Sequence, residues 1–405
     1  MSKIRIRAIT LGMPLSELGN MTRDALEFYT LAESLFNAAG FDVQTRRMVF
    51  DPLDASMLEP QARVLATLER ASLKASEAGV RWCCCPIDPG LAFSKSEIRK
   101  ALIPIIQRLP NMFVHFLVTK GEQLQLGVLT DIARCFLDIS KLSASGYDNF
   151  RVGAGCRIPP NTPFFPFSWH DGLPGFSIAV ESISAWHHLA TPEFSALPPA
   201  EKELLCVQQL GPIFRSIESV CHEIAQKTAF EYKGMDTSLA PFPDAGRSVT
   251  ALIQKMAPER CGTPGTLAAT ALCTSILRRI IAEAQIKTAG FNGVMYSPLE
   301  DGGFSGLLGR DVDIHKLLLY STVCGCGVDM VPLVGTTLPE DLASLIQDVA
   351  VLALRLNKPL GIRVLPIPGG RVNEMTTFNH DFLVNCRILA LEGQGLMAGD
   401  TWTIQ

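Results

Sequence analysis

The sequence predicts one large α/β domain of about ten strands, arranged as a barrel or as a doubly wound sheet. Short apolar stretches bounded by glycine or proline alternate with longer stretches of helical periodicity, which favours parallel strands joined by helical crossovers. Apolar residues make up 47% of the 405 residues and charged residues 19%, so a large core can be buried. No linker-like run divides residues 1–405, although two related halves could meet near residues 190–230.

The first half of the chain shows the clearest alternation. Residues 4–11 (IRIRAITL) alternate between apolar and polar side chains until Gly12, as is typical of a strand. Residues 80–87 form an apolar run after Gly79, which favours a strand buried on both faces. By the same patterns we expect further strands at 43–50, 112–119, 150–158 and 176–181, and helices at 21–39, 61–78, 96–108, 126–142 and 199–226.

The second half is predicted to resume the alternation after a segment of broken patterning. A long helix should begin near residue 267, where an apolar stretch follows CGTPGT. We expect two more helices, at 313–320 and 338–357, and strands at 293–298, 328–334 and 360–365. The total for the chain is therefore about ten strands.

Bulk properties restrict the functional classes. A formal net charge of −4 gives no reason to expect nucleic acid or an anionic membrane as partner, so we expect a small-molecule substrate. No apolar run reaches the roughly 18 residues of a membrane span, and the opening residues resemble a strand rather than a signal peptide. The twelve cysteines lack zinc-site spacing, which favours reduced thiols and a cytoplasmic location. The high apolar content is consistent with a homodimer.

The segment 234–266 is predicted to contribute to a ligand site. Prolines make its first part a rigid turn, which carries Asp236 as a proton-transfer or metal-binding group and Ser238 as a substrate-binding group. The helix that follows should begin near Thr263 and Thr266, where free N–H groups can hold a carboxylate. The alternative is a capped helix behind an irregular loop.

A loop rich in proline and aromatic residues, 157–170, follows a predicted strand end, where ligand sites of α/β proteins gather. Arg157 could clamp a carboxylate and Asn161 could hydrogen-bond to it. His170 could act as an acid or a base. The alternative is a surface loop that packs its aromatic side chains, with His170 merely hydrogen-bonded.

Acidic residues suggest a cation site. Glu300 and Asp301 lie beside two glycines after a predicted strand, where they can bind a cation or, in the case of Glu300, accept a substrate proton. With Asp236 and Asp329 they supply enough oxygen ligands for Mg²⁺ or Ca²⁺, if the fold brings them together. Adjacent acids also commonly face solvent. The motifs of nucleotide-binding loops, serine hydrolases and zinc proteases are absent, so no other cofactor is expected.

Two cysteines separated by one glycine precede the strand predicted at 328–334. Cys324 and Cys326 can be a thiol nucleophile with its resolving partner, or two ligands for a soft metal. The alternative is that both are small buried hydrophobic residues. Arg363, in the last predicted strand, is expected near the same rim, as a substrate-binding residue.

Between residues 234 and 371 the chain carries, in order, MDTSLAPFPDAGRSV, GTPGTLAATAL, SPLEDGG, VCGCGVDMVPLVGTT and IRVLPIPGG. These motifs, and more weakly the opening IRIRAIT, resemble a family of bacteria and archaea known as domain of unknown function 711, or uncharacterised protein family 0210. The chain departs from that family where SPLEDGG replaces a more acidic SEDEG-type run.

The resemblance implies a fold similar to the ten-stranded α/β barrel of glycyl-radical enzymes, the pyruvate-formate-lyase-like fold. In that fold a cysteine sits on a central finger loop, and Cys324 matches it by position. The carboxy-terminal segment RVNEMTTFNHDF does not match the glycyl-radical motif, so radical chemistry is disfavoured.

Together these expectations describe an enzyme acting on a small carboxylate-bearing metabolite, as a lyase, an isomerase or a hydrolase. Arg157 and the helix start at 263–266 would hold the acid group. Asp236, Glu300 or His170 would transfer protons, and Cys324 would place a thiol near the reacting atom. The alternatives are a non-catalytic ligand-binding or regulatory protein and a structural subunit of a larger assembly.

Overall fold

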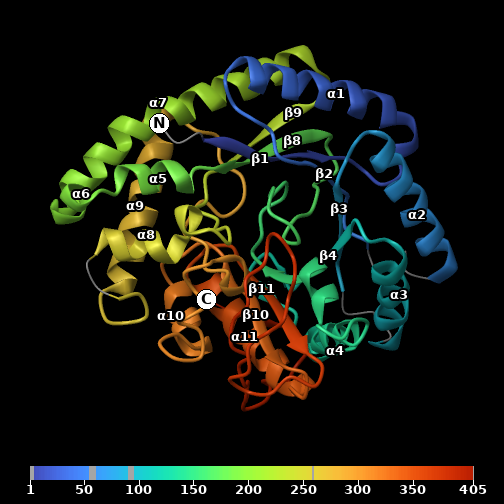
Figure 1. Ribbon diagram of the computed structural model, residues 1–405. Coiled ribbons are helices and arrows are strands. Elements are labelled where there is room, and N and C mark those ends of the chain that lie inside the picture. The colour runs from blue at the N-terminus through green and yellow to red at the C-terminus, as the bar shows by residue number, and fades with distance from the viewer. Residues whose placement is uncertain (1–3, 54–60, 90–94, 258–259, 405) are drawn as a thin grey trace.

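The computed structural model describes residues 4–53, 61–89, 95–257 and 260–404. Its central feature is a nine-stranded sheet of order β10-β11-β7-β4-β3-β2-β1-β8-β9, which draws strands from both ends of the chain (Figure 1). Six of its eight neighbouring strand pairs are parallel. The expected α/β class is confirmed.

The first half of the chain supplies strands that all run in one direction. They are β1 (Arg5–Gly12), β2 (Arg46–Val49), β3 (Trp82–Ile87), β4 (Met112–Leu117) and β7 (Val152–Cys156). The unbroken apolar run of β3 is buried almost throughout, as its composition predicts. The connecting helices are α1 (Leu18–Ala38), α2 (Gln61–Glu77), α3 (Lys95–Arg108) and α4 (Leu129–Ser140).

The second half runs in the opposite direction. Its strands are β8 (Gly175–Glu181), β9 (Glu231–Asp236), β10 (Gly327–Val334) and β11 (Leu360–Ile367). β8 pairs antiparallel with β1, and β11 pairs antiparallel with β7, so the two halves meet twice. The longer helices are α7 (Pro199–Lys227), α9 (Thr266–Ala284) and α11 (Pro339–Arg355), and the shorter ones are α5 (Ile183–Leu189), α6 (Pro192–Ala196), α8 (Val249–Met256) and α10 (Ile314–Ser321).

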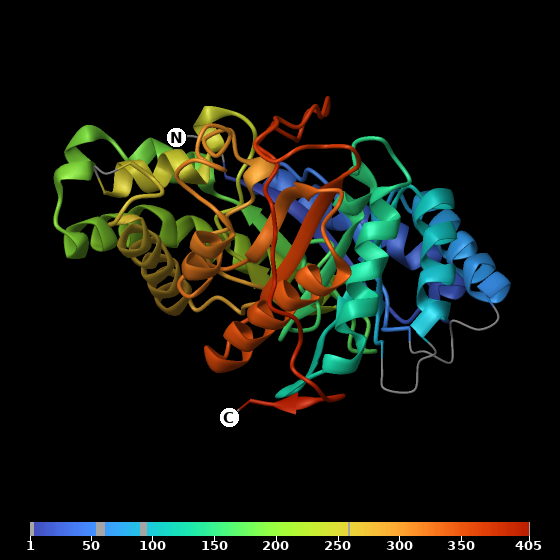
Figure 2. The ribbon, with the colours of Figure 1, turned by 90° about the horizontal axis from the view of Figure 1, so that it is seen from below.

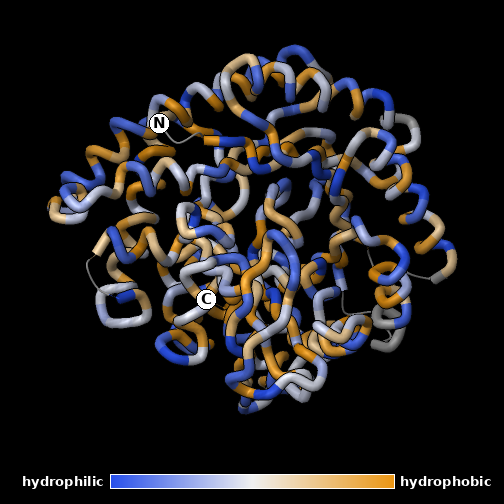
Figure 3. Tube along the Cα trace, in the orientation of Figure 1, coloured by the Kyte–Doolittle hydropathy of each residue, from blue (hydrophilic) through white to orange (hydrophobic). Residues whose placement is uncertain are grey.

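The helices lie outside the curve of the sheet (Figures 1 and 2). Hydrophilic and hydrophobic residues alternate along their turns (Figure 3), as expected of helices that bury one face against strands. A small separate sheet joins β5 (Thr119–Lys120) and β6 (Gln123–Leu124) to β12 (Trp402–Thr403) near the carboxy terminus. Among the described residues, no helix combines the length and the apolar character needed to cross a membrane.

The loop 157–174, between β7 and β8, turns into the space inside the sheet. It packs against strands of both halves, where glycines make room. A Cβ at Gly153 or at Gly361 would lie 2.5 Å from the side chain of Pro166 or Phe167, respectively. The buried ring of His115 on β4 holds the loop through Nδ1, 3.0 Å from the carbonyl oxygen of Ser168. We call this segment the interior loop.

The segment 286–296 lies between the two edge strands of the sheet. On one side it forms hydrogen bonds with the end of β9 and with the residues that follow this strand. Met235 N donates to Lys287 O at 2.8 Å, and Leu239 N donates to Gly293 O at 2.9 Å. On the other side, Gly325 N donates to Val294 O at 2.6 Å, just before β10 begins. The segment therefore bridges the edges, although its pairing is limited to isolated bridges.

Three expectations about the sheet are corrected. The predicted strand at 293–298 gives way to isolated bridges and a 3-10 turn at Pro298–Glu300, since positive φ angles at Gly290 and Asn292 interrupt extended backbone just before it. β9 ends at Asp236, inside a segment whose glycine and prolines suggested an irregular turn. Within the described residues the regular ladder has nine strands and two edges, so a closed ten-stranded barrel is not observed.

Replacing Gly293 by alanine tests the contact between the bridging segment and the loop before β10. A Cβ there would lie 2.8 Å from the Cα of Gly325, so we expect a loss of about 1–3 kcal/mol in the free energy of unfolding. Gly306→Ala is the control, because a Cβ at that position meets nothing within 4 Å and the change should stay within about 0.5 kcal/mol. Urea unfolding measures both, and equal effects would contradict the close contact.

His115 should make the protein sensitive to acid. Burial lowers the pKa of its imidazole from 6.5 to about 4. Between these values the unfolded chain binds a proton and the folded chain does not. Stability that is present above pH 6.5 is therefore lost as the pH falls towards 4, by about 3 kcal/mol. Unfolding free energies of wild type and His115→Gln across this range should differ in slope, and parallel curves would refute the assignment.

Candidate active site

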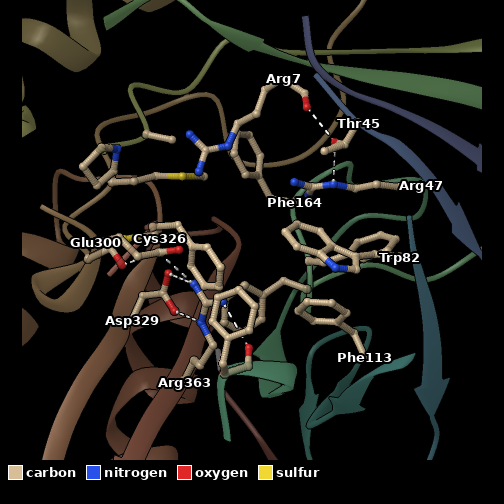
Figure 4. A pocket seen from close by; sticks show the side chains of 18 of the residues that line it. Arg7, Thr45, Arg47, Trp82, Phe113, Phe164, Glu300, Cys326, Asp329 and Arg363 are labelled. Carbon is tan, nitrogen blue, oxygen red and sulfur yellow. Dashed lines mark hydrogen bonds and ion pairs between the residues drawn. The ribbon is translucent and has the colours of Figure 1, made fainter. Parts of the chain in front are cut away.

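A cavity of about 180 Å³ lies between the interior loop and strands of both halves (Figure 4). Its lining combines charged groups, one thiol and a wall of aromatic rings. The charged and thiol side chains are Arg7, Arg47, Arg81, Arg363, Glu300, Asp329 and Cys326. The rings are those of Trp82, Phe113, Phe150, Phe164, Phe165, Phe167, Phe242, Phe291 and Phe382.

Two of these arginines, on neighbouring strands, have no carboxylate partner among the described residues. Arg7 lies on β1, and its Nη1 is buried without a hydrogen-bond partner in the described chain. Arg47 lies on β2 and, within the described residues, donates to neutral oxygens only, from Nη1 to Pro163 O at 3.1 Å and from Nε to Thr45 Oγ1 at 3.3 Å. Burial lowers the pKa of both, and Arg7 adds to the effect at Arg47, whose pKa falls to about 9. Among the described residues neither guanidinium group has a carboxylate within ion-pair distance, although Glu300 attracts both through space.

Aromatic faces hold these two cations without neutralising them. The guanidinium carbon of Arg7 lies 4.2 Å from the ring centre of Phe242 and 5.7 Å from that of Phe164. That of Arg47 lies 5.1 Å from Trp82 and 5.4 Å from Phe165. Stacking of this kind fixes the guanidinium plane and leaves its N–H edge available for a ligand.

Arg363 on β11 is buried too, but its charge is compensated. Its Nε and Nη2 donate to the two oxygens of Asp329 at 2.6 and 2.9 Å, and Nη2 also donates to Glu300 Oε2 at 3.1 Å. Although burial opposes its charge, Asp329 and Glu300 raise the pKa of Arg363. Ser297 Oγ donates to the same Glu300 oxygen at 2.5 Å. Both of these bonds use Oε2, so they leave Oε1 of Glu300 available to a ligand.

Cys326, rather than Cys324, lines the cavity. Its sulfur accepts a hydrogen bond from the backbone N–H of Tyr296 at 3.2 Å. A hydrogen bond between the two thiols lowers the pKa of Cys324 and raises that of Cys326, so the shared proton stays on Cys326. The ammonium group of Lys358, which donates to the carbonyl oxygen of Cys324, also lowers the pKa of Cys324.

Asp236 and Ser238 lie outside this cavity, at the end of β9. Asp236 is fully buried, and its Oδ1 accepts hydrogen bonds from the backbone N and Oγ of Ser238 at 2.9 and 2.5 Å. Its Oδ2 accepts a hydrogen bond from Phe291 N at 2.7 Å. Burial raises the pKa of the Asp236 carboxyl, and these hydrogen bonds oppose the rise. The carboxylate thus fastens the bridging segment to β9.

Asp301, Thr263 and Thr266 are likewise engaged outside the cavity lining. Asp301 Oδ2 accepts hydrogen bonds from the N and Oγ1 of Thr250, both at 2.9 Å, and so satisfies the first turn of α8. Thr266 Oγ1 accepts a hydrogen bond from Gly262 N at 2.9 Å, and Thr263 Oγ1 donates to Arg260 O at 2.6 Å. Both hydroxyl groups therefore form hydrogen bonds with the loop that precedes α9.

The interior-loop residues Arg157, Asn161 and His170 also lie away from the cavity. Arg157 forms an ion pair with Glu122 beside a separate surface depression. His170 Nδ1 lies 3.1 Å from Asn161 Oδ1, and its Nε2 is buried without a partner among the described residues. Burial lowers the pKa of His170. Three of the expected site residues line the cavity, namely Glu300, Asp329 and Arg363. Cys324 does not line it, but it interacts with Cys326, which does.

Within the described residues, no group of three or more histidine, cysteine, aspartate or glutamate side chains is arranged to hold a metal ion. Of the four acids expected to bind one, Glu300 and Asp329 meet on Arg363. Asp236 and Asp301 instead accept hydrogen bonds from nearby backbone N–H and hydroxyl groups. A requirement for Mg²⁺ or Ca²⁺ stays a prediction.

Arg7 and Arg47 are the candidates that sequence reasoning missed. Their signal is a charged residue inside a short strand that is otherwise largely buried. Arg46 carries the same signal, yet it pairs with Glu33 at 2.6 Å and does not line the cavity. The face that each arginine occupies depends on the neighbouring strands, so the pattern alone does not separate them.

Fold and cavity together define an α/β protein of two opposed halves with an arginine- and aromatic-lined cavity between them. The chain belongs to the family described as Uncharacterised ACR (DUF711), whose model matches residues 1–379. The family expected from the motifs is therefore confirmed.

Similar proteins from other organisms carry the name UPF0210 protein. One from Syntrophotalea carbinolica is 28% identical over 419 residues, which covers 92% of this chain and 87% of the relative. One from Pyrobaculum arsenaticum is 27% identical over 352 residues, covering 84% and 77%. One from Desulforudis audaxviator is 36% identical over 171 residues, covering 41% and 37%. These names state no reaction.

Methionine substitutions should separate the two kinds of buried arginine. Arg363→Met leaves Asp329 and Glu300 without their cation and should destabilise the protein by about 3–5 kcal/mol. Arg47→Met removes an uncompensated buried charge and should leave stability unchanged or raise it by about 1 kcal/mol. Chemical unfolding of the ligand-free variants measures both, and a similar loss for each would contradict the distinction.

Proposed function

We propose that this protein is an enzyme that moves a proton on a small carboxylate-bearing metabolite, as a lyase or an isomerase. The observation that supports the proposal is the pair Arg7 and Arg47, which face the same cavity as Glu300 and lack a carboxylate partner in the described chain. An anion that entered this space would gain charge-assisted hydrogen bonds from both guanidinium groups. The cavity also offers a carboxylate and a thiol close to that anion.

In this proposal Arg7 and Arg47 bind the substrate carboxylate and stabilise the negative charge that spreads onto it when the neighbouring carbon loses a proton. Glu300 Oε1 accepts that proton. Ser297 and Arg363 hold the other oxygen of Glu300, which fixes the carboxylate without filling its second acceptor. Asp329 positions Arg363 through the paired bonds described above.

Cys326 is proposed to return a proton to the substrate. Its pKa is raised by the hydrogen bond to Cys324 and by burial, which suits a donor better than a thiolate nucleophile. Hydrolysis, the third reaction class expected from the sequence, has less support for this reason. The ammonium group of Lys358, which lowers the pKa of Cys324, would help to stabilise the negative charge on the thiol pair after the transfer.

We further propose that the segment 286–296 acts as a tenth strand and closes the sheet into a barrel similar to the pyruvate-formate-lyase-like fold. Its backbone bonds to both edges of the sheet support this reading. So does the division into two halves of opposite direction. The twelve cysteines are buried thiols, which fits the proposed cytoplasmic location.

Exchange of substrate protons with solvent tests the proposed chemistry. We expect the protein in D₂O to deuterate the α-carbon of at least one acid from a panel of acids that carry a proton on that carbon, starting with mandelate. Glu300→Gln should slow this exchange by about 100-fold or more, since general acid–base catalysis contributes at least that much. Proton NMR of the acid measures the rate.

The control for this experiment is Glu122→Gln, which alters an exposed carboxylate next to Arg157 and should leave exchange unchanged. Equal exchange by wild type and Glu300→Gln would refute the role of Glu300. Binding of an acid without exchange by any variant would favour the alternative, a non-catalytic ligand-binding or regulatory protein.

A further inference from the structure

We infer that the substrate is a monocarboxylate with a flat apolar ring on the carbon that loses the proton, the chemistry of an arylacetic acid. The inference rests on the proposed function and deepens it, because it fixes both the charge and the body of the acid. It follows from the net charge of the buried lining, the hydrogen bonds that the neutral polar side chains already make, and the rings that form the walls.

Two of the four arginines in the lining need no charge from a ligand. Nε and Nη2 of Arg363 donate to the two oxygens of Asp329 at 2.6 and 2.9 Å, so these two charges cancel within the protein. Arg81 is exposed, so water screens its charge. The charge that a buried ligand meets is therefore set by the other charged side chains of the lining.

These other side chains are Glu300, Arg7 and Arg47, and together they leave one positive charge. Glu300 attracts both guanidinium groups through space and raises the pKa of each, against the effect of burial. One carboxylate offsets one of the two cations, so a ligand with a single negative charge makes the buried lining neutral. A dianion would leave one negative charge buried without compensation, which costs free energy.

The same balance holds while the proton moves. In the proposed reaction the C–H bond of the α-carbon breaks, its proton goes to Glu300 Oε1, and the electron pair spreads onto the substrate carboxylate. Glu300 becomes neutral and the substrate gains one negative charge, so the total charge in the cavity does not change. Arg7 and Arg47 then face a doubly charged intermediate. An aromatic ring on the α-carbon takes up part of the electron pair and makes the proton easier to remove.

The hydroxyl and amide side chains of the lining are already hydrogen-bonded within the protein. Thr45 Oγ1 donates to a backbone carbonyl oxygen of β1 at 2.7 Å, and Ser297 Oγ donates to Glu300 Oε2 at 2.5 Å. The side-chain amide of Gln44 donates to Glu181. A substrate body rich in hydroxyl groups would lose its hydrogen bonds to water and gain few new ones here. An apolar body loses no such bonds.

Aromatic rings form the wall that lies away from the acids. Figure 4 shows Trp82 and Phe113 on the far side of the cavity from Glu300 and Asp329. The ring centres of Trp82, Phe113 and Phe150 lie 5.3 to 6.2 Å from one another. A flat ring added to this cluster makes offset or edge-to-face contacts of the same kind. The cavity of about 180 Å³ has room for it, since an apolar protein cavity of about 150 Å³ binds benzene.

Calorimetric titration with matched acids tests both parts of the inference. At about pH 7.5 phenylacetate, cyclohexylacetate and acetate each carry one charge, whereas phenylmalonate carries two and its monomethyl ester carries one. We expect phenylacetate to bind at least about tenfold more tightly than acetate, and about threefold more tightly than cyclohexylacetate, whose ring is not flat. The monomethyl ester should bind at least about tenfold more tightly than phenylmalonate.

Each part can fail separately. Acetate or cyclohexylacetate binding as tight as phenylacetate would overturn the flat apolar body, and phenylmalonate binding as tight as its ester would overturn the single charge. Either result leaves the proposed proton transfer standing, because deuterium exchange with the Glu300→Gln variant measures that step. If none of the five acids binds, the acid site is refuted, and the proposed function with it.

A change of one charge in the lining should shift the preference in a defined direction. Glu300→Gln makes the buried lining more positive by one, so the affinity for phenylmalonate relative to its ester should rise at least about tenfold. Glu122→Gln is the matched control, because Glu122 pairs with Arg157 away from the cavity.

Arg47→Met provides the opposite change and a second test if Glu300→Gln does not fold. It removes the remaining positive charge, so phenylacetate should bind no more tightly than the neutral phenylacetamide. A preference for phenylmalonate that does not rise in Glu300→Gln, or a preference for phenylacetate over phenylacetamide that survives in Arg47→Met, would overturn the inference.

Discussion

The space inside the curve of the sheet has to be filled, and the interior loop fills it. Protein interiors are packed as densely as organic crystals, so strands that curve around a hollow need side chains from elsewhere. The loop brings Phe164, Phe165 and Phe167 into that space, and glycines at positions such as Gly153 and Gly361 let it approach the strands. The cavity is the part that the loop leaves open. Its aromatic walls therefore belong to the core as much as to the site.

Buried arginines serve two different purposes in this molecule. Arg363 is balanced by Asp329 and Glu300, and the three form a rigid unit on the second half of the sheet. Arg7 and Arg47 are stacked on rings and have no carboxylate within ion-pair distance among the described residues. Buried uncompensated charge is expensive, and proteins that keep it generally do so for a ligand. The contrast between these arginines, more than any single group, is the observation on which the proposed site rests.

Much of the fold could be predicted from local patterns. β3 is an apolar run that follows a glycine, and α11 has clear helical periodicity with Pro339 at its start, so both were expected within a few residues. β9 was missed because Gly234 and the prolines after Asp236 resemble a turn, whereas pairing with β8 holds the backbone extended. Tertiary hydrogen bonding overrode the local signal there.

The site was harder to predict, because it depends on which residues meet. Glu300, Asp329 and Arg363 were expected as site residues and do share the cavity. Asp236 and Asp301 carry the same chemical group, but their local donors give them structural roles that composition does not reveal. Arg47 and Arg46 are adjacent and identical in type, and the register of β2 between its neighbouring strands decides which one faces inward. Spacing in the sequence contains no such information.

The antiparallel meeting of the two halves has a consequence for synthesis. Arg7 and Arg47 leave the ribosome early, whereas Asp329 and Arg363 come from strands near the end of the chain. A nascent or truncated chain would carry the stacked arginines without the opposing acids, and β7 would lack its neighbour β11. The complete pocket thus exists only after β11 has been synthesised. A copy that stops before β10 therefore lacks Asp329 and Arg363, which face these arginines across the cavity.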